Sequence, residues 1–221
     1  MVVAKFLNER QIGFDTQAIG FPNLGDCMGA VLQNEGGLFG FHIYGLGGLM
    51  DGEFGRYMQA NAGFRANSSH LYGCCYWPRR YGGGQGLAQW KAEMIALADA
   101  VGYHGPISGI DTSKGTGIKK TETTYVEYRL GGTGECEIYY KRMSKMSTTD
   151  TNVTAGPDIK LIRKDMAAMK LAGRTHDDAP IYGHYDLPGS ATTSADVMAT
   201  KSNKGKMHRV KSSALITFNH P

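Results

Sequence analysis

Apolar runs broken by turn residues predict a β-rich first half of the chain. Two apolar segments, MGAVLQ at positions 28–33 and LFGFHIY at 38–44, flank the tetrapeptide NEGG. Asn and Gly readily adopt the positive φ angles that tight hairpin turns require. The pattern therefore predicts an antiparallel hairpin with Glu35 and Gly36 at its tip.

Other extended segments surround this hairpin. VVAKFL at positions 2–7 predicts a short strand, and QAIGFPNL at 17–24 leads into the hairpin. HLYGCCYWP at 70–78 is filled continuously by aromatic and small apolar residues, which predicts a third strand that Pro78 ends. TETTYVEYRL and GECEIYYKRM, joined by GGT within 121–143, predict a second hairpin because Thr, Tyr, Val and Ile dominate them.

The clearest helix is predicted between residues 87 and 101. Apolar residues recur there at alternating spacings of three and four and form one stripe: Leu87, Trp90, Met94, Leu97 and Val101. A helix with such a stripe packs on a sheet. Gly102 stands where helices favour a left-handed stop, and RRYGGGQG at 79–86 predicts a flexible break before the helix.

The composition changes after Ser144 toward Ser, Thr, Asn and Ala. We expect a helix from Asp158 to Leu171, then a turn-rich stretch, and a final strand from Ser213 to Phe218. Residues from about 145 to 221 are interpreted as a C-terminal elaboration packed on the core.

Length and composition point to one globular domain spanning residues 1–221. The chain has 221 residues, 41% of them hydrophobic and 20% charged, which is ordinary, but its 31 glycines are about twice the usual share. Many turns and short strands follow. With the elements above, the expected fold class is α/β in the α+β sense: a layered sheet or sandwich core of mostly antiparallel or mixed strands with flanking helices.

Charge and hydropathy exclude two classes of partner. The formal net charge is only +4, and the basic segment from Lys201 to Lys211 has no interleaved aromatic residues, so it predicts a solvated tail or rim rather than a nucleic-acid site. No apolar run approaches the roughly 20 residues that span a bilayer. The N-terminus lacks the long uncharged core of a signal peptide, so we expect a soluble chain that encodes no export signal of that kind.

The four cysteines, at positions 27, 74, 75 and 136, do not form a disulfide framework or a zinc pattern. His70 with Cys74 is the only metal-like fragment, and a structural role is the better interpretation. Reduced thiols in a reducing compartment, with no metal and no cofactor, are expected.

Cys27 and His42 are the candidate reactive pair. With the tip at Glu35 and Gly36, paired residues have numbers that add to 71, so His42 lies opposite Gly29 and Cys27 opposite Tyr44. Both side chains then share one face, with diagonal Cβ atoms about 7 Å apart. A histidine beside a thiol favours the thiolate and can protonate a leaving group, which is acyl-transfer chemistry. His184, between aromatic residues near Asp186, is the best rival histidine, and a structural role is favoured for it.

LGDCMGAVL followed by GLFGFHI resembles the LGSC-type cysteine motif and downstream strand histidine of bacterial glutamine deamidases. These are the chemotaxis receptor deamidases, the catalytic domain of cytotoxic necrotizing factors and the Burkholderia lethal factor. The matching positions are Leu24, Gly25, Cys27 and His42. Two departures are Asp26, where the family often has serine, and Phe21, where some members have threonine.

The resemblance implies an activity and a fold. In that family the cysteine attacks the side-chain carboxamide of a glutamine in a target protein, ammonia leaves, and water hydrolyses the thioester to glutamate. The fold is a compact layered α/β structure with the pair on neighbouring strands. The implied target is a host GTPase or translation factor, or a bacterial receptor, and the implied location is the bacterial cytoplasm before delivery, with secretion or injection into a host cell as the route of a virulence effector. We expect a monomer.

The group that orients the histidine stays open. It can be a backbone carbonyl or a polar residue of the preceding segment, with Thr16, Gln17 and Asn23 as candidates. The turn-forming LGDC sequence, including Asp26, can present backbone N–H groups to an oxyanion. Loops at 45–57 and 81–86 would set specificity.

Two further functions remain as alternatives. One is another Cys–His acyl-transfer enzyme, such as a peptidase, an amidase or a transglutaminase-like enzyme. The other is a glycine-rich binding domain in which Cys27 is a buried small hydrophobe and His42 a satisfied core histidine.

Overall fold

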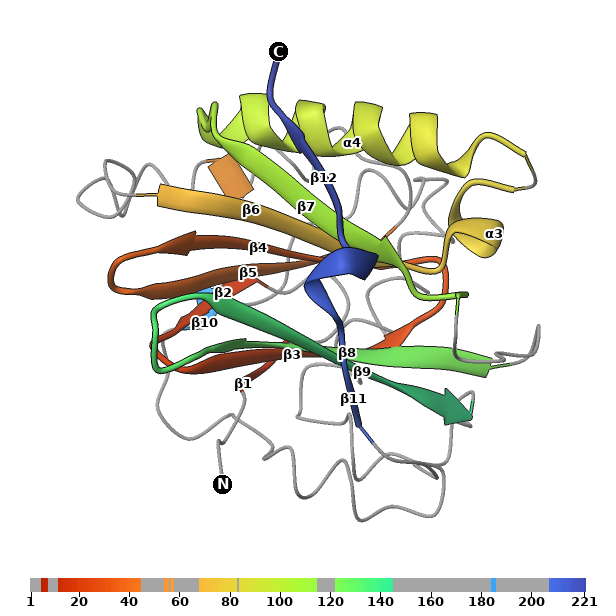
Figure 1. The fold of residues 1–221 in the computed structure, drawn as a ribbon, viewed down its shortest axis with the longest axis horizontal. Coiled ribbons are helices and arrows are strands. Elements are labelled where there is room, and N and C mark those ends of the chain that lie inside the picture. Colours follow the sequence, from red (N-terminus) through yellow and green to blue (C-terminus); the bar gives the residue numbers. More distant parts are fainter. Residues whose placement is uncertain are drawn as a thin grey trace, which may run out of the picture.

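The protein has a mixed α+β fold built from two stacked sheets and a covering helix (Figure 1). The computed structural model describes, by number, residues 5–7, 12–44, 54–55, 57, 68–82, 84–114, 122–144, 184–185 and 207–221. The expected fold class, a layered core of mostly antiparallel strands with few helices, is confirmed.

The larger sheet has seven strands in the order β10-β2-β5-β4-β6-β7-β12. Their bounds are Ile12–Asp15 for β2, Met28–Asn34 for β4, Gly37–Ile43 for β5, Ser68–Cys75 for β6, Pro106–Asp111 for β7, His184–Tyr185 for β10 and Ile216–Asn219 for β12. Neighbours are antiparallel except for the pairs β10–β2 and β6–β7.

The smaller sheet has five strands in the order β1-β3-β8-β9-β11. Their bounds are Lys5–Phe6 for β1, Ala18–Leu24 for β3, Glu122–Leu130 for β8, Cys136–Ser144 for β9 and His208–Arg209 for β11. Only the pair β1–β3 is parallel. The second predicted hairpin is confirmed as β8 and β9.

Helix α4 (Gly86–Val101) connects the parallel strands β6 and β7 and covers the outer face of the larger sheet (Figure 1). Its buried stripe includes Trp90, Met94, Leu97 and Val101, and Gly102 ends it with a φ of 66°, as predicted. Leu87 was wrongly placed in the stripe: it is 43% exposed, because it lies in the first turn, before the helix meets the sheet.

Strand alternation divides the interior into two cores. Along β4, Met28, Ala30 and Leu32 face α4, whereas Val31 and the preceding Cys27 face the smaller sheet. Side chains two apart on a strand point the same way. Cys27 therefore belongs to the layer between the two sheets.

Several elements differ from the sequence prediction. Strands β2 and β7 were missed, since one has only four residues and PISGID carries a proline and a glycine that read as loop. The predicted break at 79–86 instead begins in a short helix, α3 (Trp77–Arg80), whose Pro78 suits a first turn. The final strand is shifted to Ile216–Asn219. The helix predicted from Asp158 to Leu171 lies outside the described residues.

The last described segment connects the two sheets. It pairs with β9 as β11, passes through the 3-10 turn η2 (Ser212–Ala214), and pairs with β7 as β12 beside α4 (Figure 1). None of the helices described here is long and apolar enough to cross a bilayer.

Candidate functional site

The predicted register of the first hairpin is confirmed. In the β4–β5 pair Gly29 lies opposite His42 and Met28 opposite Ile43, so the paired numbers add to 71. Directly opposed residues point to the same face, and residues two apart on a strand do as well. His42 and Cys27 consequently share the face of the larger sheet that packs on the smaller one.

The imidazole of His42 has a fixed tautomer. Its Nδ1 lies 2.7 Å from the backbone oxygen of Leu7, and a carbonyl can only accept a hydrogen bond, so Nδ1 carries the proton. Burial lowers the pKa of His42 to about 4, the bond to Leu7 opposes that shift, and the charge of Arg80 adds to it. The ring is neutral at pH 7, and Nε2 holds a lone pair.

That second nitrogen has no hydrogen-bond partner among the described residues, although it is buried. A buried polar nitrogen is usually satisfied, and an exception needs an explanation. A neutral Nε2 has a lone pair that can accept a proton, and it lies on the same face of the sheet as Cys27.

Leu7 is itself held in place from both sides. Its N–H donates to the Gly20 oxygen at 2.9 Å, which extends the β1–β3 pairing by one residue. Its side chain is fully buried and fits over Gly40, where a Cβ atom would lie 2.7 Å from a Leu7 methyl carbon. The carbonyl that orients His42 is therefore rigidly placed, and it is of the backbone type that the sequence left open.

Gly29 allows the Phe21 ring to pack beside His42. A Cβ atom there would lie 2.7 Å from the Phe21 ring, and that ring meets the His42 ring edge to face at 5.8 Å. The Tyr128 hydroxyl donates to the Gly29 oxygen at 2.8 Å. Phe21, at the position where some glutamine deamidases have threonine, therefore packs its aromatic ring against His42.

Asp26 does not orient the histidine. Its carboxylate is 52% exposed and pairs with Arg79 at 3.0 Å. Its backbone oxygen accepts a 2.5 Å hydrogen bond from Arg80, so two neighbouring arginines of α3 hold the peptide just before Cys27.

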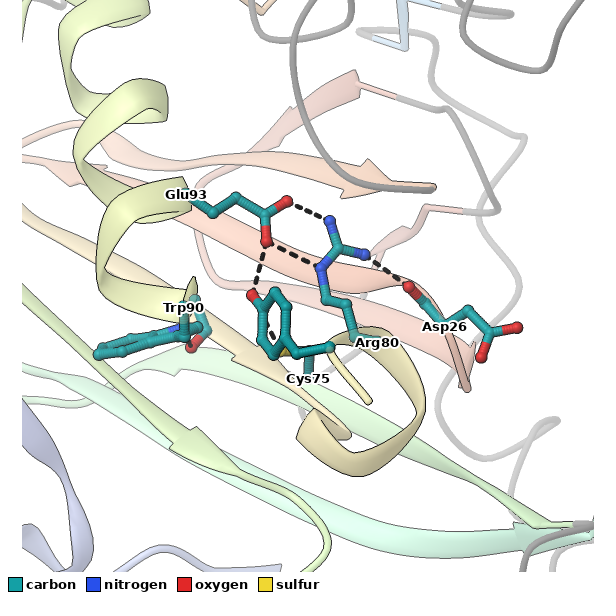
Figure 2. Close-up of polar contacts among 7 residues, drawn as sticks. Asp26, Cys75, Arg80, Trp90 and Glu93 are labelled. Carbon is teal, nitrogen blue, oxygen red and sulfur yellow. Dashed lines mark hydrogen bonds and ion pairs between the residues drawn. The ribbon is translucent and has the colours of Figure 1, made fainter. Parts of the chain in front are cut away.

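Arg80 belongs to a buried polar network under α4 (Figure 2). Its guanidinium binds both oxygens of Glu93, one through Nη2 and one through Nε at 2.9 Å. The Tyr81 hydroxyl donates to Glu93 at 2.5 Å, and the Cys75 thiol lies 3.8 Å from that hydroxyl. Tyr81 was expected in a specificity loop but is a buried member of this network.

None of the remaining candidates for the orienting group is hydrogen-bonded to the His42 imidazole. Thr16 and Gln17 are exposed in the turn after Asp15, which is level with Leu38. That position is four residues from His42, about 13 Å along the strand. Asn23 lies in a bulge of β3 with a φ of 62°, and its buried Oδ1 has no partner within the described part of the chain.

None of the four cysteines, all within the described residues, forms a disulfide. Cys74 and Cys75 are fully buried, which raises the pKa of Cys74 to about 11 and that of Cys75 further. Burial also raises the pKa of Cys136. Cys74 lies on β6 opposite Gly29 of β4. Because burial raises their pKa values, these three thiols are poorly suited to be nucleophiles.

His70 and Cys74 do not form a metal pair. They are four residues apart on β6, about 13 Å, and His70 instead meets the Ser108 hydroxyl at 2.8 Å and stacks on Tyr72. His184 lies in β10, and its side chain is outside the described part of the chain.

Both members of the pair are buried. Cys27 is 5% exposed and His42 is 2% exposed. Of the loop predicted at 45–57, residues 45–53 lie outside the described chain, whereas Phe54 and Tyr57 are buried in the core under α4.

No protein-family profile matches this chain. A search of curated proteins also found no match.

Proposed function

We propose that this chain is a cysteine-dependent glutamine deamidase that acts on a protein, with Cys27 as nucleophile and His42 as base and acid. The observation that supports it best is the unsatisfied Nε2 of a neutral His42 on the face of Cys27, with Nδ1 fixed by Leu7. A cysteine, a base and a group that orients the base form the usual arrangement for nucleophilic catalysis.

The low pKa of His42 determines how the proton moves. An imidazolium at this buried position is unfavourable, so the resting pair is a thiol and a neutral imidazole. As the sulfur attacks the carboxamide carbon, Nε2 takes the thiol proton. The tetrahedral intermediate then collapses, the carbon–nitrogen bond breaks, and the imidazolium gives its proton to the departing ammonia.

Water completes the reaction. With His42 neutral again, Nε2 removes a proton from a water molecule that attacks the thioester. The carbon–sulfur bond breaks, the glutamate product is released, and the imidazolium returns its proton to the sulfur, which regenerates the thiol and the neutral imidazole. The Leu7 carbonyl acts as a positioning group, because it keeps the hydrogen on Nδ1 and the lone pair on Nε2 in both half-reactions.

The small exposed fraction of Cys27 favours a slender substrate group. A glutamine side chain carries its carboxamide on two unbranched methylene groups, whereas a peptide backbone brings a whole chain to the sulfur. Papain-like peptidases in addition place the cysteine at a helix N-terminus, and Cys27 precedes strand β4. Both points favour deamidation over peptide cleavage.

The test is incubation of the protein with bacterial and host cell extracts, followed by mass spectrometry of the extract proteins. A deamidase adds about one dalton at a specific glutamine, and Cys27→Ser and His42→Asn must abolish the change while Cys74→Ser retains it. Backbone cleavage that depends on Cys27 would select the peptidase. No Cys27-dependent change in any extract would favour the binding domain.

A further inference from the structure

A second cluster of reactive side chains lies at the other end of the larger sheet. Asp99, His104 and His220 each offer a ligand atom, and these atoms all lie within 4.8 Å of one another. Pro106 of β7 and Asn219 of β12 are paired beside this cluster, whereas Asp111, at the far end of β7, is level with Cys75 and Met28. Five residues of β7, about 16 Å, separate the two ends.

Three separate elements bring the cluster together. Asp99 lies in the last turn of α4, and the chain folds back because the N–H of Tyr103 donates to the Ala98 oxygen at 2.8 Å. His104 follows in the loop to β7. The β7–β12 ladder continues past its last pair, as the His220 N–H donates to the Gly105 oxygen at 3.3 Å, and this register sets His220 beside His104.

We propose that His104 and His220 bind a transition-metal ion of the Zn²⁺ class through their Nδ1 atoms, with Asp99 orienting His220. The two Nδ1 atoms are 3.3 Å apart. A tetrahedral zinc ion with bonds of about 2.0–2.1 Å holds two nitrogen ligands about 3.4 Å apart. The spacing therefore matches a shared ion with little movement of either ring.

Asp99 supports the tautomer that this role requires. His220 Nε2 lies 2.9 Å from the Asp99 carboxylate and donates to it, so a ring that binds a metal through Nδ1 keeps its one hydrogen on Nε2. A carboxylate on the far nitrogen is the usual outer partner of a metal-binding histidine. The His220 side chain is only 7% exposed, which holds the ring in this orientation.

A cation is also favoured by what surrounds the two rings. The backbone oxygen of Pro221 lies 2.9 Å from His220 Nδ1 and accepts a hydrogen bond when that nitrogen is protonated, so a cation bound at Nδ1 would replace the proton and meet the same oxygen. The site adjoins the C-terminal end of α4, where the helix dipole favours positive charge. Imidazole ligands select Zn²⁺, Cu²⁺ or Ni²⁺ over Mg²⁺ and Ca²⁺, which prefer oxygen.

The proposed ion would clip the end of β12 to the end of α4. Strand β12 is an edge strand of the larger sheet and pairs only with β7 in that sheet. A metal ion that joins its end to α4 would therefore stabilise this edge. The sequence predicted no metal here because His220 lies 116 positions from His104 along the chain.

The test is titration of Zn²⁺ into the full chain with its thiols reduced, followed by calorimetry, together with thermal unfolding with and without Zn²⁺. Removal of a ligand by His104→Ala or His220→Ala should eliminate one equivalent of bound Zn²⁺ and the rise in Tm that it causes. Asp99→Asn should weaken binding at least about tenfold. The matched control is His208→Ala, which removes an exposed histidine of the same segment and should change nothing.

Because His104 is exposed, its variant should fold normally, and far-ultraviolet circular dichroism of the variant should match that of the wild type. Any Zn²⁺ bound at Cys27 and His42 would persist in all these variants, so only the difference in bound Zn²⁺ between the wild type and each variant reports on this site. Equal stoichiometry and affinity in the wild type and His104→Ala would overturn the proposal, as would a wild type that takes up no Zn²⁺.

Discussion

The imidazole of His42 donates a 2.7 Å hydrogen bond to the backbone oxygen of Leu7 in the opposite layer of the fold. This bond joins the larger sheet to the residue that follows the edge strand of the smaller one. It explains why a histidine is tolerated in a largely apolar layer, and it leaves Nε2 as the base that the proposed chemistry needs.

Burial of neutral His42 should make stability depend on pH. The pKa is about 4 in the folded chain, against an ordinary value of 6.5. As the pH falls from 6.5 toward 4, His42 binds a proton in the unfolded chain but not in the folded chain, so the free energy of unfolding decreases in that window. Above pH 6.5 the contribution of His42 to the free energy of unfolding is constant. At about pH 4.5 the loss from this residue should be about 2–3 kcal/mol.

His42→Asn isolates this effect. An asparagine amide can replace Nδ1–H as donor to Leu7 but has no titrating nitrogen. Urea unfolding of both proteins at about pH 7.5 and about pH 4.5 measures the difference, and other titrating groups, His70 among them, are common to both. A stability difference that is the same at both pH values would show that His42 is not held neutral.

Gly29 is required by the packing of the site. In Gly29→Ala the new methyl group would lie 2.7 Å from the Phe21 ring, which is itself fully buried. Overpacking of this kind costs about 1–3 kcal/mol. Gly132→Ala is the matched control, because a Cβ there meets nothing within 4 Å. Denaturant unfolding should separate the two variants; equal stabilities would contradict the described fit of Phe21.

Two neighbouring arginines of α3 should differ sharply in their effect on stability. Arg80→Met leaves the buried Glu93 carboxylate without its cation and should cost about 3–5 kcal/mol. Arg79→Met removes a pair in which the Asp26 side chain is half exposed and should cost at most about 1 kcal/mol. The double variant Arg80→Met with Glu93→Leu should recover much of the loss in urea unfolding, and a failure to recover would mean that the Arg80 bond to the Asp26 oxygen dominates.

Local sequence signals predicted the elements around the site well. The NEGG turn set the register that places His42 opposite Gly29, and the apolar stripe and Gly102 set the limits of α4. These features depend on residues close together in the chain.

Contacts between distant segments escaped prediction. The Leu7 carbonyl reaches His42 across 35 positions and has no side-chain signature. Arg80 was interpreted as part of a flexible break. Its partner Glu93 lies 13 positions away on α4, and the sequence does not show how that helix packs against residues 79–86. Strand β7 forms only because β6 and β12 pair on both sides of a segment with weak strand propensity.

The most direct measurement of the central claim is the rate at which iodoacetamide alkylates each cysteine as a function of pH, read by peptide mass spectrometry. An ordinary thiol reacts near its pKa of about 8.5. Because the neutral His42 Nε2 can take the thiol proton while the sulfur attacks, Cys27 should react fastest of the four and well below that pH, and His42→Asn should remove the advantage. The account is contradicted if Cys27 reacts no faster than the buried Cys74, or if its pH dependence is the same in His42→Asn.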